Sequence, residues 1–153
     1  MDIQVKYYTP DDDSDGKSLF TFGYPIILVN KECSKPRKRF TIAHELGHIL
    51  LGHVGKYGLI NREPSPNDNP IEQEANIFAS RLLAPACVLW GCQVCNAEEL
   101  AKLCGISKKA AIYRMERLRI LYTRNAFLRS PLERQVYKQF KSFIANHQHL
   151  VNP

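Results

Sequence analysis

Apolar and polar residues alternate along the first 30 positions of the chain with the period of β-strands. Ile3, Val5 and Tyr7 lie two positions apart, which places their side chains on one face of a strand. Residues 18–22 form a short β-prone run, and residues 26–29 form a continuous apolar run. The pattern predicts a small antiparallel β-sheet in this part of the chain.

Beyond the predicted sheet, apolar residues recur every three or four positions, which is typical of helices. A first helix has an apolar side formed by Ile42, Leu46, Ile49 and Leu50. A second helix is indicated by Asn69 as its cap, Pro70 in its first turn and Pro85 at its end. The polar, proline-containing loop at 54–69 joins the two helices, and we expect it to be exposed at the rim of a cleft. A small sheet packed on these helices is an α+β fold.

The last third of the chain has the pattern of further helices. Residues 99–110 indicate a helix, a tight turn at Gly105 and a second helix capped by Ser107, which resembles a helix-turn-helix. Residues 132–150 carry apolar side chains close to helical spacing and predict a terminal helix. This part of the chain is therefore expected to be entirely helical.

Length and charge refine this organisation. The 153 residues suit one compact domain, or one domain with a small appendage. We assign residues 1–86 to the core and residues 87–153 to a helical segment packed on it. The net charge is +6, and from Glu98 onward 11 Lys and Arg residues stand against 4 Glu. A basic surface is predicted there from Arg114, Arg117, Arg119 and Arg124. Such a surface favours weak contact with nucleic acid, although packing alone also explains an amphipathic helix pair.

The run RFTIAHELGHILLGH contains the pattern HExxH. His44 and His48 are four positions apart, so on a helix they share a face and can reach one metal ion. Glu45 lies beside them and can contact a metal-bound water, as in zinc-dependent peptidases. Gly47 is unfavourable inside a helix, and we therefore expect another backbone to approach it closely.

A catalytic zinc site needs three protein ligands and one open position. Glu72 on the second helix can supply the third ligand, and Glu74 is the alternative. Residues two apart on a helix point in different directions, so only one of the two can bind. Asn76, one turn after Glu72, is placed to hold the outer ring nitrogen of His44 or His48, and this relation favours Glu72.

RFTIAHELGHILLGH together with the later E-x-x-A-N-x-F-A-x-x-L-L-x-P resembles the ImmA/IrrE family of metallopeptidases, closely over residues 26–85 and more loosely over 98–121. The resemblance implies three zinc ligands, His44, His48 and Glu72. It implies Glu45 as the general acid/base. It also implies a characteristic protein substrate, a helix-turn-helix transcriptional repressor whose cleavage relieves repression of stress or mobile-element genes.

The ligand set predicts a mechanism. Zinc bound to two neutral imidazoles and a carboxylate lowers the pKa of its water to about 7, and Glu45 can move that water's proton to the leaving amine. Manganese or iron suits the same ligands. The oxyanion-stabilising group stays open among His53, Tyr57 and Arg81. Besides a zinc endopeptidase, we consider a DNA-binding regulator with a structural zinc site and a hydrolase of other amides.

The chain has five cysteines, an odd number. Cys92 and Cys95 form a lone CxxC that would need Cys87 or Cys104 to complete a second zinc site. The chain shows neither a signal-peptide pattern nor an apolar run long enough to span a membrane. We therefore expect reduced thiols, a cytoplasmic location and no membrane partner.

Overall fold

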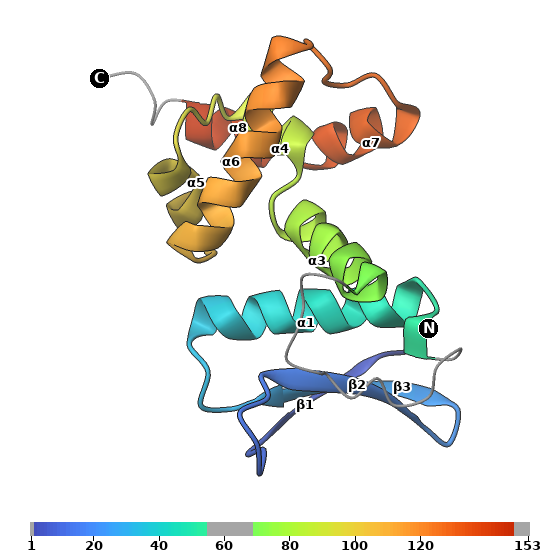
Figure 1. The fold of residues 1–153 in the computed structure, drawn as a ribbon. Coiled ribbons are helices and arrows are strands. Elements are labelled where there is room, and N and C mark those ends of the chain that lie inside the picture. Colours follow the sequence, from blue (N-terminus) through green and yellow to red (C-terminus); the bar gives the residue numbers. More distant parts are fainter. Residues whose placement is uncertain (1, 55–68, 149–153) are drawn as a thin grey trace. The chain divides into compact units, whose positions relative to one another are not determined.

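The computed structural model describes residues 2–54 and 69–148, and the chain divides into two compact units (Figure 1). The first unit comprises Met1–Leu82 and the second comprises Leu83–Pro153. Within the described residues, no helix is long and apolar enough to span a lipid bilayer.

The sheet of the first unit has three strands in the order β1-β3-β2, namely β1 (Gln4–Tyr8), β2 (Gly16–Thr21) and β3 (Tyr24–Asn30). β2 pairs with β3 antiparallel, whereas β1 pairs with β3 in parallel. The α+β fold class is confirmed, but the prediction of an antiparallel sheet was wrong for β1. Apolar alternation reports which face a side chain occupies and does not report the direction of a strand.

A two-residue turn joins β2 to β3. Phe22 and Gly23 both have positive φ, 51° and 82°. Turns of this kind match the twist of a hairpin, and glycine adopts them without steric cost. The turn sets the pairing of the two strands, in which Ser18 lies opposite Ile27.

Helix α1 (Lys35–Leu50) packs on one face of the sheet (Figure 1). The small core of this unit contains Ile27, Val29, Ile49 and Val54. Leu50 is 54% exposed, so its predicted place on the buried side was wrong. The buried residues of α1 include Ile49 and also the polar residues of the motif, His44, Glu45 and His48.

Helix α3 (Pro70–Leu83) begins where the capping pattern predicts. The side-chain oxygen of Asn69 accepts a hydrogen bond from the N–H of Ile71 at 3.0 Å. α3 packs against α1 at Gly47, where Ala75 and Phe78 occupy the space that a side chain would need. The predicted close approach at Gly47 is confirmed. The loop predicted between the two ligand helices lies, over residues 55–68, outside the described residues.

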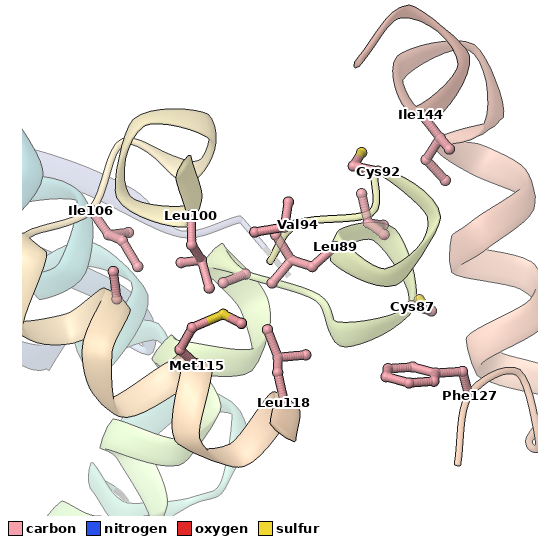
Figure 2. Packing of buried hydrophobic residues seen from close by; sticks show 13 residues of the cluster. Cys87, Leu89, Cys92, Val94, Leu100, Ile106, Met115, Leu118, Phe127 and Ile144 are labelled. Atoms are coloured by element: carbon pink, nitrogen blue, oxygen red, sulfur yellow. The ribbon is translucent and has the colours of Figure 1, made fainter. Parts of the chain in front are cut away.

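The second unit is helical and contains α4 (Ala86–Gly91), α5 (Ala97–Cys104), α6 (Lys108–Thr123), α7 (Pro131–Gln139) and α8 (Lys141–His147). Leu89, Leu100 and Leu118 are fully buried and come from α4, α5 and α6. Figure 2 shows these residues within a larger apolar cluster, to which Ile144 of α8 contributes. The second unit thus has a hydrophobic core of its own.

The helix pair predicted in the basic region is present. The side chain of Asn96 caps α5, Gly105 has a left-handed conformation (φ 60°), and the side chain of Ser107 caps α6. Of the arginines predicted to form a basic surface, Arg117, Arg119 and Arg124 are exposed, but Arg114 is buried. Its Nε donates a hydrogen bond to the Ala84 carbonyl at 2.9 Å, so its assignment to the surface was wrong.

The predicted terminal helix is interrupted. α7 ends and α8 begins at Phe140 (φ −95°, ψ 10°). Val136 and Tyr137 of α7 and Ile144 of α8 all pack in the core, whereas Leu132 is 73% exposed. The change of direction lets both short helices contribute to the core.

Candidate metal centre

Three potential ligand atoms converge between α1 and α3. The Nε2 atoms of His44 and His48, on successive turns of α1, are 2.9 Å apart. Glu72 of α3 places Oε2 at 3.2 Å from the Nε2 of His44 and Oε1 at 3.3 Å from the Nε2 of His48. All three residues are buried, with exposed fractions of 1%, 4% and 6% for His44, His48 and Glu72.

These separations fit a metal ion. Zinc binds histidine nitrogen and carboxylate oxygen at about 2.0–2.2 Å, which places neighbouring ligand atoms of a tetrahedron about 3.3–3.6 Å apart. The two separations that involve Glu72, 3.2 Å and 3.3 Å, are close to that range, and the 2.9 Å between the two imidazole nitrogens is shorter. Among the described residues, His44, His48 and Glu72 are the group of three that could hold a metal ion. Glu74, the alternative third ligand, does not belong to this group.

The imidazoles also determine the charge state of Glu72. Hydrogen bonds from His44 and then His48 are the largest influences, and they lower the pKa of the Glu72 carboxyl far below its usual value against the opposing effect of burial. Glu72 is therefore a carboxylate at neutral pH. An ionised carboxylate beside two imidazole nitrogens is the donor set that a divalent cation requires.

The outer nitrogen of His44 has a partner on α3. Its Nδ1 lies 2.9 Å from the side-chain oxygen of Asn76. The structure thus brings Asn76 to His44, one of the two histidines for which the sequence suggested it. Because a carbonyl oxygen only accepts hydrogen bonds, Nδ1 of His44 carries a proton in this contact. In the neutral ring that a metal ion would require, Nε2 then has no proton and keeps its lone pair for the ion.

The outer nitrogen of His48 has a different partner. Its Nδ1 lies 3.0 Å from the Nδ1 of His53, whose Nε2 lies 3.1 Å from Oε2 of Glu74. Both ring nitrogens of His53 are engaged, which leaves neither for an oxyanion in this arrangement. Of the other oxyanion candidates, Arg81 is exposed near the end of α3, and Tyr57 lies outside the described residues.

Glu45 is anchored by the sheet. The hydroxyl of Ser18 on β2 donates a hydrogen bond to Oε2 of Glu45 at 2.8 Å, and both residues are buried. Glu45 follows His44 directly in the chain and does not belong to the ligand group. Ser18 was not among the site residues predicted from the sequence. A serine facing inward among apolar strand residues is a signal for such a contact, but its partner can be identified only in the fold.

The cysteines are not gathered in the same way. Cys92 is buried and Cys95 is exposed. In the part of the chain that the structure describes, these two do not form a group of potential metal ligands with Cys87 or Cys104. The hypothesis of a second, structural zinc site therefore has no support in the structure.

Comparison with known proteins places the site in a family. The sequence model of a peptidase family, described as the IrrE N-terminal-like domain, matches residues 1–116. The chain is also similar to the radiation response metalloprotease IrrE of Deinococcus radiodurans, with 34% identity over 97 residues. That match covers 58% of this chain and 30% of the relative. The chain therefore spans less than a third of the length of this curated relative.

Proposed function

The chain belongs to the family of the IrrE N-terminal-like domain, a metallopeptidase family, and from this membership and its site we propose that it is a zinc-dependent endopeptidase that cleaves a protein partner. One observation carries the proposal. The ligand atoms of His44, His48 and Glu72 converge within 3.3 Å of one another, and Glu45, the residue after His44, has one carboxylate oxygen held by Ser18.

The proposed mechanism divides the work between the metal ion and the chain. A zinc ion held by His44, His48 and Glu72 would supply Lewis-acid chemistry, which polarises a carbonyl and makes water more acidic. Glu45 takes the proton of the attacking water on Oε1, the oxygen that Ser18 does not hold, and returns it to the leaving amine. Because Ser18 fixes the other oxygen, Glu45 keeps its orientation during both transfers.

The sheet offers a place for an extended substrate. β2 lies at the edge of the sheet in the order β1-β3-β2. An extended peptide can pair with an exposed strand edge through main-chain hydrogen bonds. Because β2 carries Ser18, a peptide on this edge would run past Glu45. This arrangement supports an endopeptidase, which binds substrate on both sides of the scissile bond.

We further propose that the partner is a helix-turn-helix transcriptional repressor and that cleavage relieves repression. The support is the resemblance of the HExxH and E-x-x-A-N segments to the ImmA/IrrE family. The product of a repressor gene next to this reading frame would be incubated with the chain, with and without chelator. Cleavage that chelator abolishes supports the proposal. If unfolded casein is cut but the repressor is not, the peptidase proposal stands and the substrate proposal fails.

Glu45→Gln tests the enzyme directly. It should lower the hydrolysis rate by about 10²–10⁴-fold, because the general base is lost, and it should keep one metal ion per chain. Glu116→Gln, at an exposed position of α6, is the matched control and should retain full activity. Wild-type hydrolysis by Glu45→Gln would rule out the proposed mechanism.

A DNA-binding regulator is the second candidate. It is favoured by the exposed Lys108, Lys109 and Arg117 on α6, the second helix of the pair joined at Gly105. If this is the function, Lys108→Glu should weaken binding to duplex DNA in a gel-shift assay, and Glu45→Gln should leave it unchanged. If the chain is a peptidase, Glu45→Gln should abolish hydrolysis and Lys108→Glu should leave hydrolysis unchanged.

A further inference from the structure

We propose that His53 and Glu74 are positioning residues of the metal site, with His53 holding the His48 ring in its ligating orientation and Glu74 holding His53. The inference rests on the proposed metal site. It assigns a role to two residues that lie outside the ligand group and outside the HExxH motif.

The contacts define a chain of three side chains that leads away from the ligand atoms. The Nε2 of His48 faces His44 and Glu72, at 2.9 Å and 3.3 Å. Its Nδ1 points the other way, 3.0 Å from the Nδ1 of His53. The Nε2 of His53 in turn lies 3.1 Å from Oε2 of Glu74.

One arrangement of protons satisfies the whole chain. A ligating imidazole keeps the lone pair of Nε2 for the metal ion, so the proton of His48 lies on Nδ1 and is donated to the Nδ1 of His53. A neutral His53 that accepts there carries its own proton on Nε2 and donates it to the Glu74 carboxylate. Glu74, which only accepts, therefore selects the form of His53 that in turn selects the ligating form of His48.

Burial indicates which of the two residues has the greater effect. His53 is 5% exposed and is held on both sides, whereas the side chain of Glu74 is 62% exposed. Water can replace the carboxylate of Glu74 as an acceptor, but His53 has buried neighbours and cannot be replaced in this way. The loss of His53 should therefore weaken metal binding more than the loss of Glu74.

Helix α3 supplies a partner for the outer nitrogen of each histidine of α1, directly for His44 and through His53 for His48. Asn76 accepts from the outer nitrogen of His44, and Glu74 ends the chain from the outer nitrogen of His48. Glu72, on the same helix, is the proposed ligand itself. Three residues of one helix thus act on the two imidazoles. Packing of α3 against α1 alone would not require these three polar contacts.

The test measures metal affinity and needs no substrate. The full chain is freed of metal with a chelator, and Zn²⁺ is titrated in competition with a chromophoric chelator. His53→Ala should weaken Zn²⁺ binding by about 10–100-fold, and Glu74→Ala should weaken it less. His53→Gln keeps a carbonyl acceptor for His48 and should recover part of the loss. In the His53→Ala background, Glu74→Ala should add almost nothing, because the two residues act in series.

His147→Ala is the matched control, because His147 lies in the second unit and its Nδ1 contacts the Phe143 carbonyl of its own helix. It should bind Zn²⁺ as the wild type does. The Co²⁺ absorption spectrum gives a second readout, since a displaced His48 changes the ligand geometry.

Two results would overturn the inference. One is a folded His53→Ala that binds Zn²⁺ as tightly as the wild type. The other is equal weakening by His53→Ala and His53→Gln together with equal loss of thermal stability in the metal-free proteins, which would show a purely structural role. If His53→Ala does not fold, the Zn²⁺ affinities of His53→Gln and Glu74→Ala test the inference, and wild-type affinity of both variants would overturn it. A wild-type chain that binds neither Zn²⁺ nor Co²⁺ would instead remove the proposed function.

Discussion

Gly47 and Ala75 are in backbone contact where α1 and α3 cross. A Cβ added to Gly47 would lie 3.3 Å from the Cα of Ala75 and 3.0 Å from Cδ1 of Phe78. Such distances are tighter than ordinary van der Waals contacts, so the crossing depends on the missing side chain. Because α1 supplies two of the proposed ligand residues and α3 the third, the same crossing would set the geometry of the proposed metal site.

Gly47→Val should therefore separate the two helices. We expect a loss of about 1–3 kcal/mol in the free energy of unfolding, as for other overpacked interiors, together with weaker Zn²⁺ binding. Urea unfolding and chelator competition measure the two effects. Leu50→Val, at an exposed position of the same helix, should change stability by less than about 0.5 kcal/mol. Tight Zn²⁺ binding by Gly47→Val would contradict this account of the crossing.

Ser18→Ala should reduce hydrolysis without removing the metal ion. A hydrogen bond to a charged group contributes about 1.5–3 kcal/mol, which corresponds to a fall of about 10–100-fold in kcat if Glu45 loses its orientation. KM and Zn²⁺ affinity should change little, and Ser18→Thr, which keeps the hydroxyl, should recover activity. In a Glu45→Gln background, Ser18→Ala should have no further effect on the residual rate. A full additive loss there would indicate that Ser18 acts independently of Glu45.

The metal-free protein should lose stability in acid through Glu72. The pKa of Glu72 is lower in the folded chain than in the unfolded chain, so the unfolded state takes up protons first as the pH falls. The stability contributed by Glu72 is fully present above the ordinary carboxyl pKa of about 4.3 and is lost as the pH falls towards the lower folded value. Chelated wild type should lose more unfolding free energy below about pH 5 than Glu72→Gln does. Parallel curves for the two proteins would contradict this.

Arg114→Ala should destabilise the second unit. Arg114 is buried and donates to the Ala84 carbonyl, and its removal leaves a cavity and an unpaired carbonyl. We expect a loss of about 2–3 kcal/mol. Arg117→Ala, at an exposed position of the same helix, should cost less than about 0.5 kcal/mol. Thermal unfolding followed by circular dichroism distinguishes the two, and equal stability of both variants would show that Arg114 is not a structural residue.

Bound zinc should raise the thermal stability of the chain. A ligand that binds only the folded state at about 100 times its dissociation constant adds about 2.7 kcal/mol. The midpoint of unfolding should therefore rise with added Zn²⁺ and fall with chelator in the wild type. Glu72→Ala, which lacks the third ligand, should show a much smaller rise. An equal response of both proteins would place the metal elsewhere.

The parts of the site that follow helical periodicity could be predicted from the sequence. His44 and His48 share a face because of their spacing, and Asn76 lies one turn from Glu72 for the same reason. The caps of α3 and α6, Asn69 and Ser107, follow from local residue types. These features depend on residues close together in the chain, which is why pattern alone located them.

The contacts that the sequence did not reveal join residues far apart. Ser18 and Glu45 are separated by 27 positions, and His53 and Glu74 by 21. The parallel pairing of β1 with β3 and the burial of Arg114 against Ala84 are long-range in the same way. Each depends on how elements pack, and a periodic pattern specifies which face is buried without specifying what lies opposite.

The hairpin turn at Phe22 and Gly23 sets the strand register that places Ser18 against the carboxylate of Glu45. Successive residues of a strand face opposite sides of the sheet, so sliding β2 by one position along β3 would turn Ser18 outward and present Lys17 or Leu19 to the carboxylate of Glu45. An ammonium group there would neutralise the base, and an isobutyl group would leave it unsupported. An insertion or deletion in this turn that shifted the register by one residue would thus abolish the proposed hydrolysis and leave His44, His48 and Glu72 in place.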